Sequence, residues 1–201
     1  MSDEREIEIE RLAALAQVGA RRAADAFAQL VDQPIWVSEA VLIDGAAETD
    51  IVLDNPEDSS WSTGVFFEFE GCLDGLVGIL FPGAASESLV RWIVGIESGE
   101  LAPPVIESAL MEVGNILASH VASGIADALE SRLLPSIPSL AMDGAEGAFQ
   151  ELIENVVGRG ALRIESAFND SSGSGCGRLV LVPTRLESSG PAEPESDSPQ
   201  L

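Results

Sequence analysis

The sequence contains no lysine. Its ten basic residues are all arginines, they stand against 34 acidic residues, and the net charge is −24 at pH 7. Proteins that bind nucleic acids need a basic surface, so this balance argues against a nucleic-acid partner. A foldable chain rich in carboxylates and free of lysine is typical of a salt-accumulating halophile, where a Debye length of about 3 Å weakens the repulsion between surface carboxylates. A merely acidic protein from a low-salt cell is the alternative.

Cysteine and histidine are scarce. Cys72 and Cys176 cannot build a disulfide framework, and they form no C-x-x-C pair. The single histidine, His120, cannot complete a zinc site with two cysteines that lie so far apart in the sequence. We therefore expect both cysteines to be small apolar fillers of the core, and we expect no metal ion or cofactor of the protein's own.

Long apolar runs are missing as well. No run reaches the roughly 18 residues that cross a bilayer, and residues 1–10 are acidic where a secretory signal would be basic and then apolar. Hydrophobic residues nevertheless make up 46% of the 201, which is too many for a disordered chain and enough to bury a core. We expect a cytoplasmic globular protein without a membrane partner.

The hydrophobic pattern predicts a mixture of helices and strands. Pro103 and Pro104 suit the first turn of a long helix, and Pro135 and Pro138 forbid its continuation. Residues 44–63 read as a loop with a short strand at 51–53. The expected helices span residues 4–33, 85–94, 103–133 and 147–157, and the expected strands span 35–43, 64–70, 75–81, 161–168 and 178–183.

The two halves of the chain repeat the same order of elements: a long helix, strand material and a hairpin. This order indicates an internal duplication, with two helices packed on one shared sheet, and the expected class is α+β. We expect one domain over residues 1–186, with halves of about 1–99 and 100–186. Residues 187–201 are Ser, Pro, Glu and Asp with almost nothing apolar, and are predicted to form a disordered acidic tail.

Three polar residues recur on one side of the second long helix. Ser108, Glu112 and Asn115 stand at positions i, i+4 and i+7, with three and then two residues between them. At about 100° per residue they fall on one narrow face. By periodicity alone, such a stripe is most often ordinary solvated surface. Asn in a helix interior costs only a few tenths of a kcal/mol relative to Ala, so its presence is weak support for a function.

The spacing of these residues resembles the motif of the CheC, CheX and FliY phosphatases. In that motif Asp or Ser is followed after three residues by Glu, after two more by Asn, and after another twenty-two by Pro. Ser108, Glu112, Asn115 and Pro138 match all four positions. The likeness extends over about residues 8–185 and, together with the composition, is strongest to a CheC from a halophilic archaeon.

The resemblance implies a CheC-like fold with two pseudo-symmetric halves, and hydrolysis of the aspartyl phosphate of the response regulator CheY. It implies that Asn115 positions the attacking water, and that Glu112 pairs with the receiver's lysine. Ser108 and Pro138 would support the motif. The protein would need no cofactor of its own, because Mg²⁺ is expected on CheY. The deamidase CheD is implied as a second partner.

CheC proteins usually carry the motif twice, and residues 18–30 resemble the segment that follows the first copy. This register puts Ala14 where Glu belongs and Gln17 where Asn belongs. Glu10 takes the Asp/Ser position, and Ala40 takes the position of the distal proline. We interpret the first site as degenerate, which leaves one active site.

Other interpretations stay open. A non-catalytic CheC paralogue that binds CheY or CheD as an adaptor would fit the lost first site, although the intact Glu112 and Asn115 count against it. A structural subunit of the flagellar switch would carry added domains or peptide-binding arms, which are not seen here. An unrelated enzyme has little support, because Walker, H-E-x-x-H and G-x-S-x-G motifs are absent, and the glycine-rich residues 171–175 precede a strand instead of a helix.

Overall fold

The computed structural model describes residues 2–44, 61–95 and 100–186, so the predicted strand at 51–53 and the predicted tail at 187–201 lie outside the described residues. The helices are α1 Ser2–Val31, α2 Gly83–Val94, α3 Pro103–Leu129 and α4 Ala145–Val156. The strands are β1 Trp36–Val37, β2 Val41–Asp44, β3 Thr63–Gly71, β4 Leu73–Phe81, β5 Leu133–Pro135, β6 Ser139–Ala141, β7 Leu162–Asn169 and β8 Gly175–Leu186.

The strands form one antiparallel sheet in the order β1-β7-β8-β4-β3-β5, and β2 also pairs with β7 while β6 pairs with β3. The order reads the same from both edges if each strand is exchanged for its counterpart in the other half. β4 and β8 meet in the middle, β3 and β7 flank them, and the short strands lie outside. The sheet confirms the α+β class and the two pseudo-symmetric halves.

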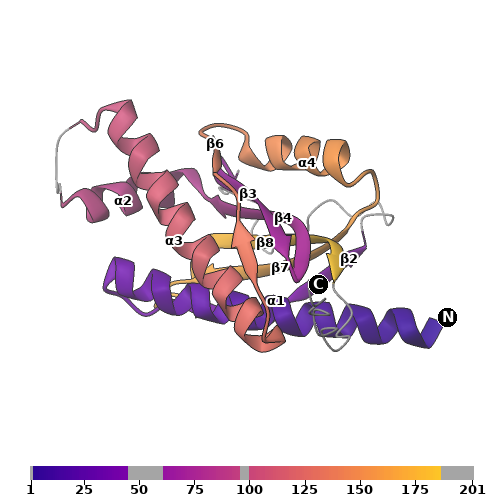
Figure 1. Ribbon diagram of the computed structural model, residues 1–201. Helices are drawn as coiled ribbons and strands as arrows, with labels where there is room; N and C mark the ends of the chain where they lie inside the picture. Colours follow the sequence, from indigo (N-terminus) through magenta and orange to yellow (C-terminus); the bar gives the residue numbers. More distant parts are fainter. Residues whose placement is uncertain (1, 45–60, 96–99, 187–201) are drawn as a thin grey trace, which may run out of the picture.

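The two long helices, α1 and α3, cover one face of the sheet (Figure 1). The two helices cross in close contact at Gly19 and Gly124. A Cβ added at Gly124 would lie only 3.1 Å from the Cα of Gly19. Only glycine allows two helix backbones to approach so far. Beneath the helices, Phe27 of α1 packs edge-on against Phe81 and Phe168 of the sheet, with ring centroids 6.1 and 5.9 Å away.

Helix α4 covers part of the opposite face (Figure 1). Phe149 stacks on Phe66 at 4.9 Å between ring centroids, and Gly78 makes room for it, since a Cβ there would lie 2.8 Å from the Phe149 ring. Strand β4 is therefore covered on both faces, and this explains why its residues 75–81 are a continuous buried run without polar alternation.

The same face holds a buried ion pair. Nη1 of Arg178 lies 3.1 Å from Oε2 of Glu165, and the Arg178 guanidinium stacks over the Trp61 ring at 4.8 Å from its centroid. Burial raises the pKa of Glu165, and the charge of Arg178 opposes that rise. A planar guanidinium can pair with a carboxylate and stack on an indole at once, which an ammonium group does less well.

The predicted strand over residues 35–43 is two short strands, β1 and β2. Ser38 separates them, because its N–H donates to the Ala167 carbonyl at 2.9 Å while the Ala167 N–H donates to Ser38 Oγ at 2.9 Å. The hydroxyl replaces a backbone acceptor, so the pairing with β7 stops there and resumes at Val41.

The predicted helix over residues 103–133 ends earlier, at Leu129. Glu130 has a left-handed φ of 50°, and its N–H bonds back to carbonyl oxygens of the last turn, which closes the helix. β5 and β6 follow, although Pro135 and Pro138 argue against strands; a proline is tolerated at a sheet edge, where β5 lies. The other predicted elements within the described residues are confirmed, with ends that differ by at most three residues.

Candidate functional site

The predicted stripe lies on one face of α3. Ser108 and Glu112 are exposed and Asn115 is half-buried, while Leu110, Val113 and other apolar residues of the helix are buried. α3 starts at Pro103 with proline in its first turn, as the sequence predicts. The helix therefore presents a carboxylate and a carboxamide side by side at a spacing of three residues.

A glycine between the two polar residues seats the helix on the sheet. A Cβ added at Gly114 would lie only 2.6 Å from Cγ1 of Val65 on β3, so the α3 backbone rests directly on that strand. Sequence reasoning missed this residue. A glycine inside a helix costs about 1 kcal/mol relative to Ala and was the signal available.

Glu112 and Asn115 form a pair that we call free, in a sense limited to the part of the chain that the structure describes. Among the residues that the structure describes, neither side chain has a hydrogen-bond or ion-pair partner. Such a pair on an exposed helix face can donate, accept and attract a cation without first breaking an internal contact.

Pro138 is half-buried and lies between β5 and β6. The chain there is fixed to β3 by Ser136, whose N–H donates to the Glu68 carbonyl at 2.8 Å and whose Oγ accepts from the Glu68 N–H at 2.9 Å. Both strands also contact α3, so the segment carrying Pro138 passes beside the helix that carries Asn115.

The first half repeats this arrangement at a shift of 98 residues. Ser38 makes the same two hydrogen bonds to β7 that Ser136 makes to β3. Along the helices, residues 12–27 and 110–125 have the same sequence of buried, half-buried and exposed positions, except that Val18 is exposed where its counterpart is half-buried. Under this shift, the positions equivalent to Ser108, Glu112, Asn115 and Pro138 are Glu10, Ala14, Gln17 and Ala40, in that order.

Gln17 differs from Asn115 because its carboxamide is bound on both sides. Nε2 of Gln17 donates to the Ser38 carbonyl at 3.2 Å, and Oε1 accepts from the Ala40 N–H at 2.5 Å. The side chain thus ties α1 to the connection between β1 and β2. Ala14 offers no carboxylate beside it, so the first half lacks the free pair of the second.

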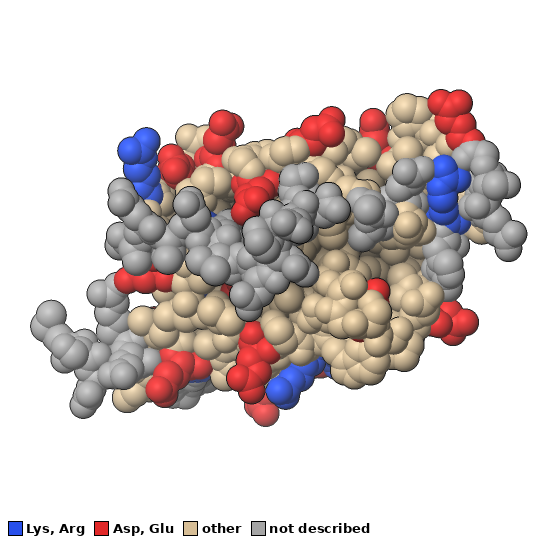
Figure 2. Space-filling model, turned by 180° about the vertical axis from the view of Figure 1, so that it is seen from behind, with Lys and Arg blue, Asp and Glu red and all other residues tan. Residues whose placement is uncertain are grey.

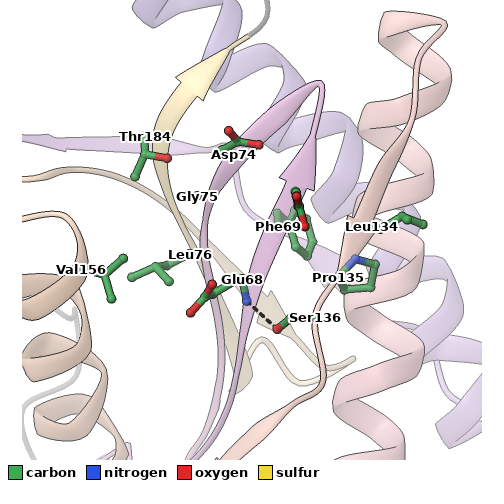
Figure 3. A pocket seen from close by; sticks show the side chains of 11 residues that line it. Glu68, Phe69, Asp74, Gly75, Leu76, Leu134, Pro135, Ser136, Val156 and Thr184 are labelled. Atoms are coloured by element: carbon green, nitrogen blue, oxygen red, sulfur yellow. Dashed lines mark hydrogen bonds between the residues drawn. The ribbon is translucent and has the colours of Figure 1, made fainter.

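A pocket of about 450 Å³ opens elsewhere, lined by residues of β3, β4, β5 and β8, by Ser136 and by Val156 at the end of α4 (Figure 3). Glu68, Glu70 and Asp74 give it an acidic lining. A hydrogen bond from the Gly71 N–H does most to hold the pKa of Asp74 below its usual range, and the paired Arg185 lowers it further. None of the motif residues on α3 lines this pocket, so the candidate site is a surface and not part of this cavity.

The two cysteines and the histidine lie apart. Cys72 is buried in the core, and burial raises the pKa of the half-buried Cys176 to about 11. His120 is exposed on α3. Within residues 2–44, 61–95 and 100–186, no three His, Cys, Asp or Glu side chains gather as a metal site would require. Nor does any helix in that part of the chain have both the length and the apolar character to cross a membrane.

Comparison with known proteins finds the same motif region. The model of the CheC-like family matches residues 105–141, which include the polar stripe and Pro138. The CheY-P phosphatase CheC of Bacillus subtilis (strain 168) is 26% identical over 182 residues, which cover 84% of this chain and 83% of the relative. The likeness therefore spans both halves.

Solved structures agree on the fold. A chain of the CheX–CheY–BeF3–Mg²⁺ complex from Borrelia burgdorferi superposes with a TM-score of 0.59 at 13% identity, covering 84% of this chain and 96% of that one. FliY from Thermotoga maritima gives a TM-score of 0.60 at 11% identity, with 87% and 88% covered. The motif on α3, the duplicated sheet and these likenesses together confirm the expected resemblance of this chain to the CheC-like family.

Proposed function

We propose that this protein removes the phosphoryl group from the aspartyl phosphate of a CheY-type response regulator. The observation that carries the proposal is the free Glu112 and Asn115 pair on the exposed face of α3. The relative named as a CheY-P phosphatase and the structural likeness to a chain of a CheX–CheY complex support it. The site of action would be the cytoplasm, where response regulators act.

The reaction needs a water in line with the phosphorus–oxygen bond and neutralised phosphoryl oxygens. We propose that the receiver domain supplies a lysine and Mg²⁺, and that this protein supplies no cofactor. Asn115 would place its carboxamide beside the phosphoryl group and hydrogen-bond the attacking water. Catalysis would then consist mainly of positioning, which alone can lower a barrier substantially.

Glu112 would bind the lysine of the receiver through a charge-assisted hydrogen bond. Both groups come from one helix, so their separation is set by the i, i+3 geometry and not by a loop. The contact of Gly114 with Val65 fixes that helix on the sheet, which favours the precise placement that such a site needs. We assign Ser108 a supporting place on the same face and no chemistry.

The surface character of the site also favours a protein substrate. Pockets that bind small molecules are concave and enclose most of the ligand. Here the motif residues lie on an exposed helix face, and they line no part of the pocket at β3, β4, β5 and β8. A phosphoryl group that arrives within the cleft of its own receiver domain needs only an inserted side chain.

A binding adaptor is the second candidate. It is favoured because the Gln17 carboxamide is hydrogen-bonded to the backbone at both ends, so that only one of the two halves keeps a free pair. CheD stays a second proposed partner for either function, on the family resemblance alone. An adaptor would hold phosphorylated CheY without accelerating the loss of phosphate.

Release of phosphate from phosphorylated CheY in molar salt separates the two candidates. We expect the protein to accelerate release well above the intrinsic rate of CheY, and Asn115→Ala to abolish most of the acceleration. Binding of phosphorylated CheY without any acceleration would instead establish the adaptor.

A further inference from the structure

The two halves hold equivalent carboxamides in opposite ways. In the first half, the Gln17 carbonyl oxygen accepts from the Ala40 N–H and the Gln17 amide donates to the Ser38 carbonyl. In the second half, the Asn115 side chain has no partner within the described residues. The difference must arise from residues that the duplication places at the same points of the fold.

The connection between strands can be compared residue by residue, because Ser38 and Ser136 anchor it identically. Each serine exchanges two hydrogen bonds with the neighbouring long strand, at distances between 2.8 and 2.9 Å. Two residues beyond each serine stands Ala40 in the first half and Pro138 in the second. Pro138 therefore occupies the position from which Ala40 donates to Gln17.

Proline has no backbone N–H, so the donor that closes the first carboxamide does not exist in the second half. The backbone of the second half therefore offers Asn115 no donor at the position from which Ala40 binds Gln17.

We propose that Pro138 is a positioning residue that keeps the Asn115 carboxamide free by withholding a backbone N–H. The inference rests on the proposed function and names how that site is kept open. With a donor at position 138, the Asn115 oxygen would be captured, and fewer molecules would have the carboxamide available for the attacking water. A net hydrogen bond of ordinary strength corresponds to about a tenfold preference for the captured form.

Pro138→Ala restores the missing donor and tests this directly. We expect kcat for dephosphorylation to fall by about three- to tenfold while KM for phosphorylated CheY stays within about twofold, because capture removes the water-orienting group and leaves Glu112 in place. A general loosening of the turn would instead disturb docking and change KM. An unchanged kcat would overturn the proposal.

A second readout needs no activity. Hydrogen exchange of the new backbone N–H at position 138 is compared between Pro138→Ala and the double variant Pro138→Ala/Asn115→Ala. We expect that N–H to be protected only while Asn115 is present, and equal exchange in both variants would overturn the proposal. This comparison holds even if the protein turns out not to dephosphorylate CheY, so the two failures are distinguishable.

Ala40→Pro supplies the matched variant in the first half, where it removes the donor to Gln17. The side-chain amide protons of Gln17 should exchange with solvent several-fold faster, because the oxygen that anchors the group is released. Unaltered exchange would show that the backbone N–H does not hold the carboxamide, and would overturn the proposal even if Pro138→Ala failed to fold.

Discussion

Asn115 and Gln17 bear the same functional group on the same face of duplicated helices, and their surroundings decide what each can do. Gln17 reaches the chain between β1 and β2, and both its amide nitrogen and its carbonyl oxygen are hydrogen-bonded to the backbone there. Asn115 stands at the equivalent position of α3, and its carboxamide has no partner within the described residues. An open carboxamide next to an open carboxylate is what the proposed reaction requires.

Replacing Asn115 by Ala should therefore affect chemistry more than binding. The helix is preserved, since Ala is the better helix former. We expect the hydrolysis step to slow by about 10² or more, as when one preorganised hydrogen-bonding group is removed from other enzymes, while affinity for phosphorylated CheY barely changes. Single-turnover phosphate release measures the rate, and titration with a non-hydrolysable phosphoryl mimic on CheY measures affinity. A variant as fast as the parent would refute the catalytic assignment.

Glu112→Ala should behave differently, because a docking contact is lost. Affinity for phosphorylated CheY and the rate should both fall, and molar salt should narrow the difference in affinity by screening the ion pair. Glu107→Ala is the matched control: it removes the same charge from the same exposed helix, but its side chain lies about 140° round the axis from Glu112. Equal losses for both variants would point to a general charge effect.

At the scale of the element, α3 can present a rigid site because it lies against β3 without an intervening side chain at Gly114. Gly114→Ala would place a methyl group 2.6 Å from the branched side chain of Val65, and the helix would have to lift. We expect the free energy of unfolding to fall by about 1–3 kcal/mol despite the better helix propensity of Ala. Denaturant titration measures this loss, and kcat should fall with it.

Gly147 in α4 is the matched control, because a Cβ there meets nothing within 4 Å. Gly147→Ala should raise the free energy of unfolding by about 0.5 kcal/mol through helix propensity alone. If both substitutions stabilised the protein, the close seating of α3 on β3 would be wrong.

The helix of the first half should be catalytically silent. We expect Glu10→Ala and Gln17→Ala to leave the dephosphorylation rate within about twofold, because neither belongs to a free pair. Stability should separate them: Gln17→Ala leaves the Ala40 N–H and the Ser38 carbonyl without their partner and should cost about 1–2 kcal/mol, whereas Glu10 is exposed. A large loss of activity in either variant would show that the first half takes part in the reaction.

The whole molecule carries far more negative than positive charge. On the face seen in Figure 2, acidic side chains are spread along the margins and arginines are sparse. A few ion pairs link distant segments, among them Arg22 with Asp127 between α1 and α3, and Arg185 with Asp74. Ten arginines are too few to neutralise the 34 acidic residues of the sequence, so self-repulsion should depend strongly on screening.

We propose that the protein is adapted to high salt, and we expect it to unfold or aggregate in dilute buffer and to be stable in molar salt. Circular dichroism melting curves across a potassium chloride series measure this dependence. Sucrose at matched osmolality is the control, because it favours the folded state without screening charge. Full stability in about 50 mM salt, where surface charges are only weakly screened, would contradict the proposal.

The sequence by itself determined what depends on neighbours along the chain. The long helices, the two hairpins, the duplicated order and the alignment of Ser108, Glu112 and Asn115 on one face all follow from local periodicity and turn residues. The match of Pro138 to the family spacing was also visible, although its surroundings were not.

Only the tertiary structure decided the short strands and the state of the two carboxamides. β5 and β6 have three residues each and exist because β3 pairs with them, against the local preference of proline. Gln17 is closed by groups 21 and 23 residues away, and Gly114 is needed because of a strand that precedes it by about fifty residues. Contacts of this range depend on how the halves pack, because a side chain's partners are set by the fold that surrounds it and not by the residues beside it in the sequence.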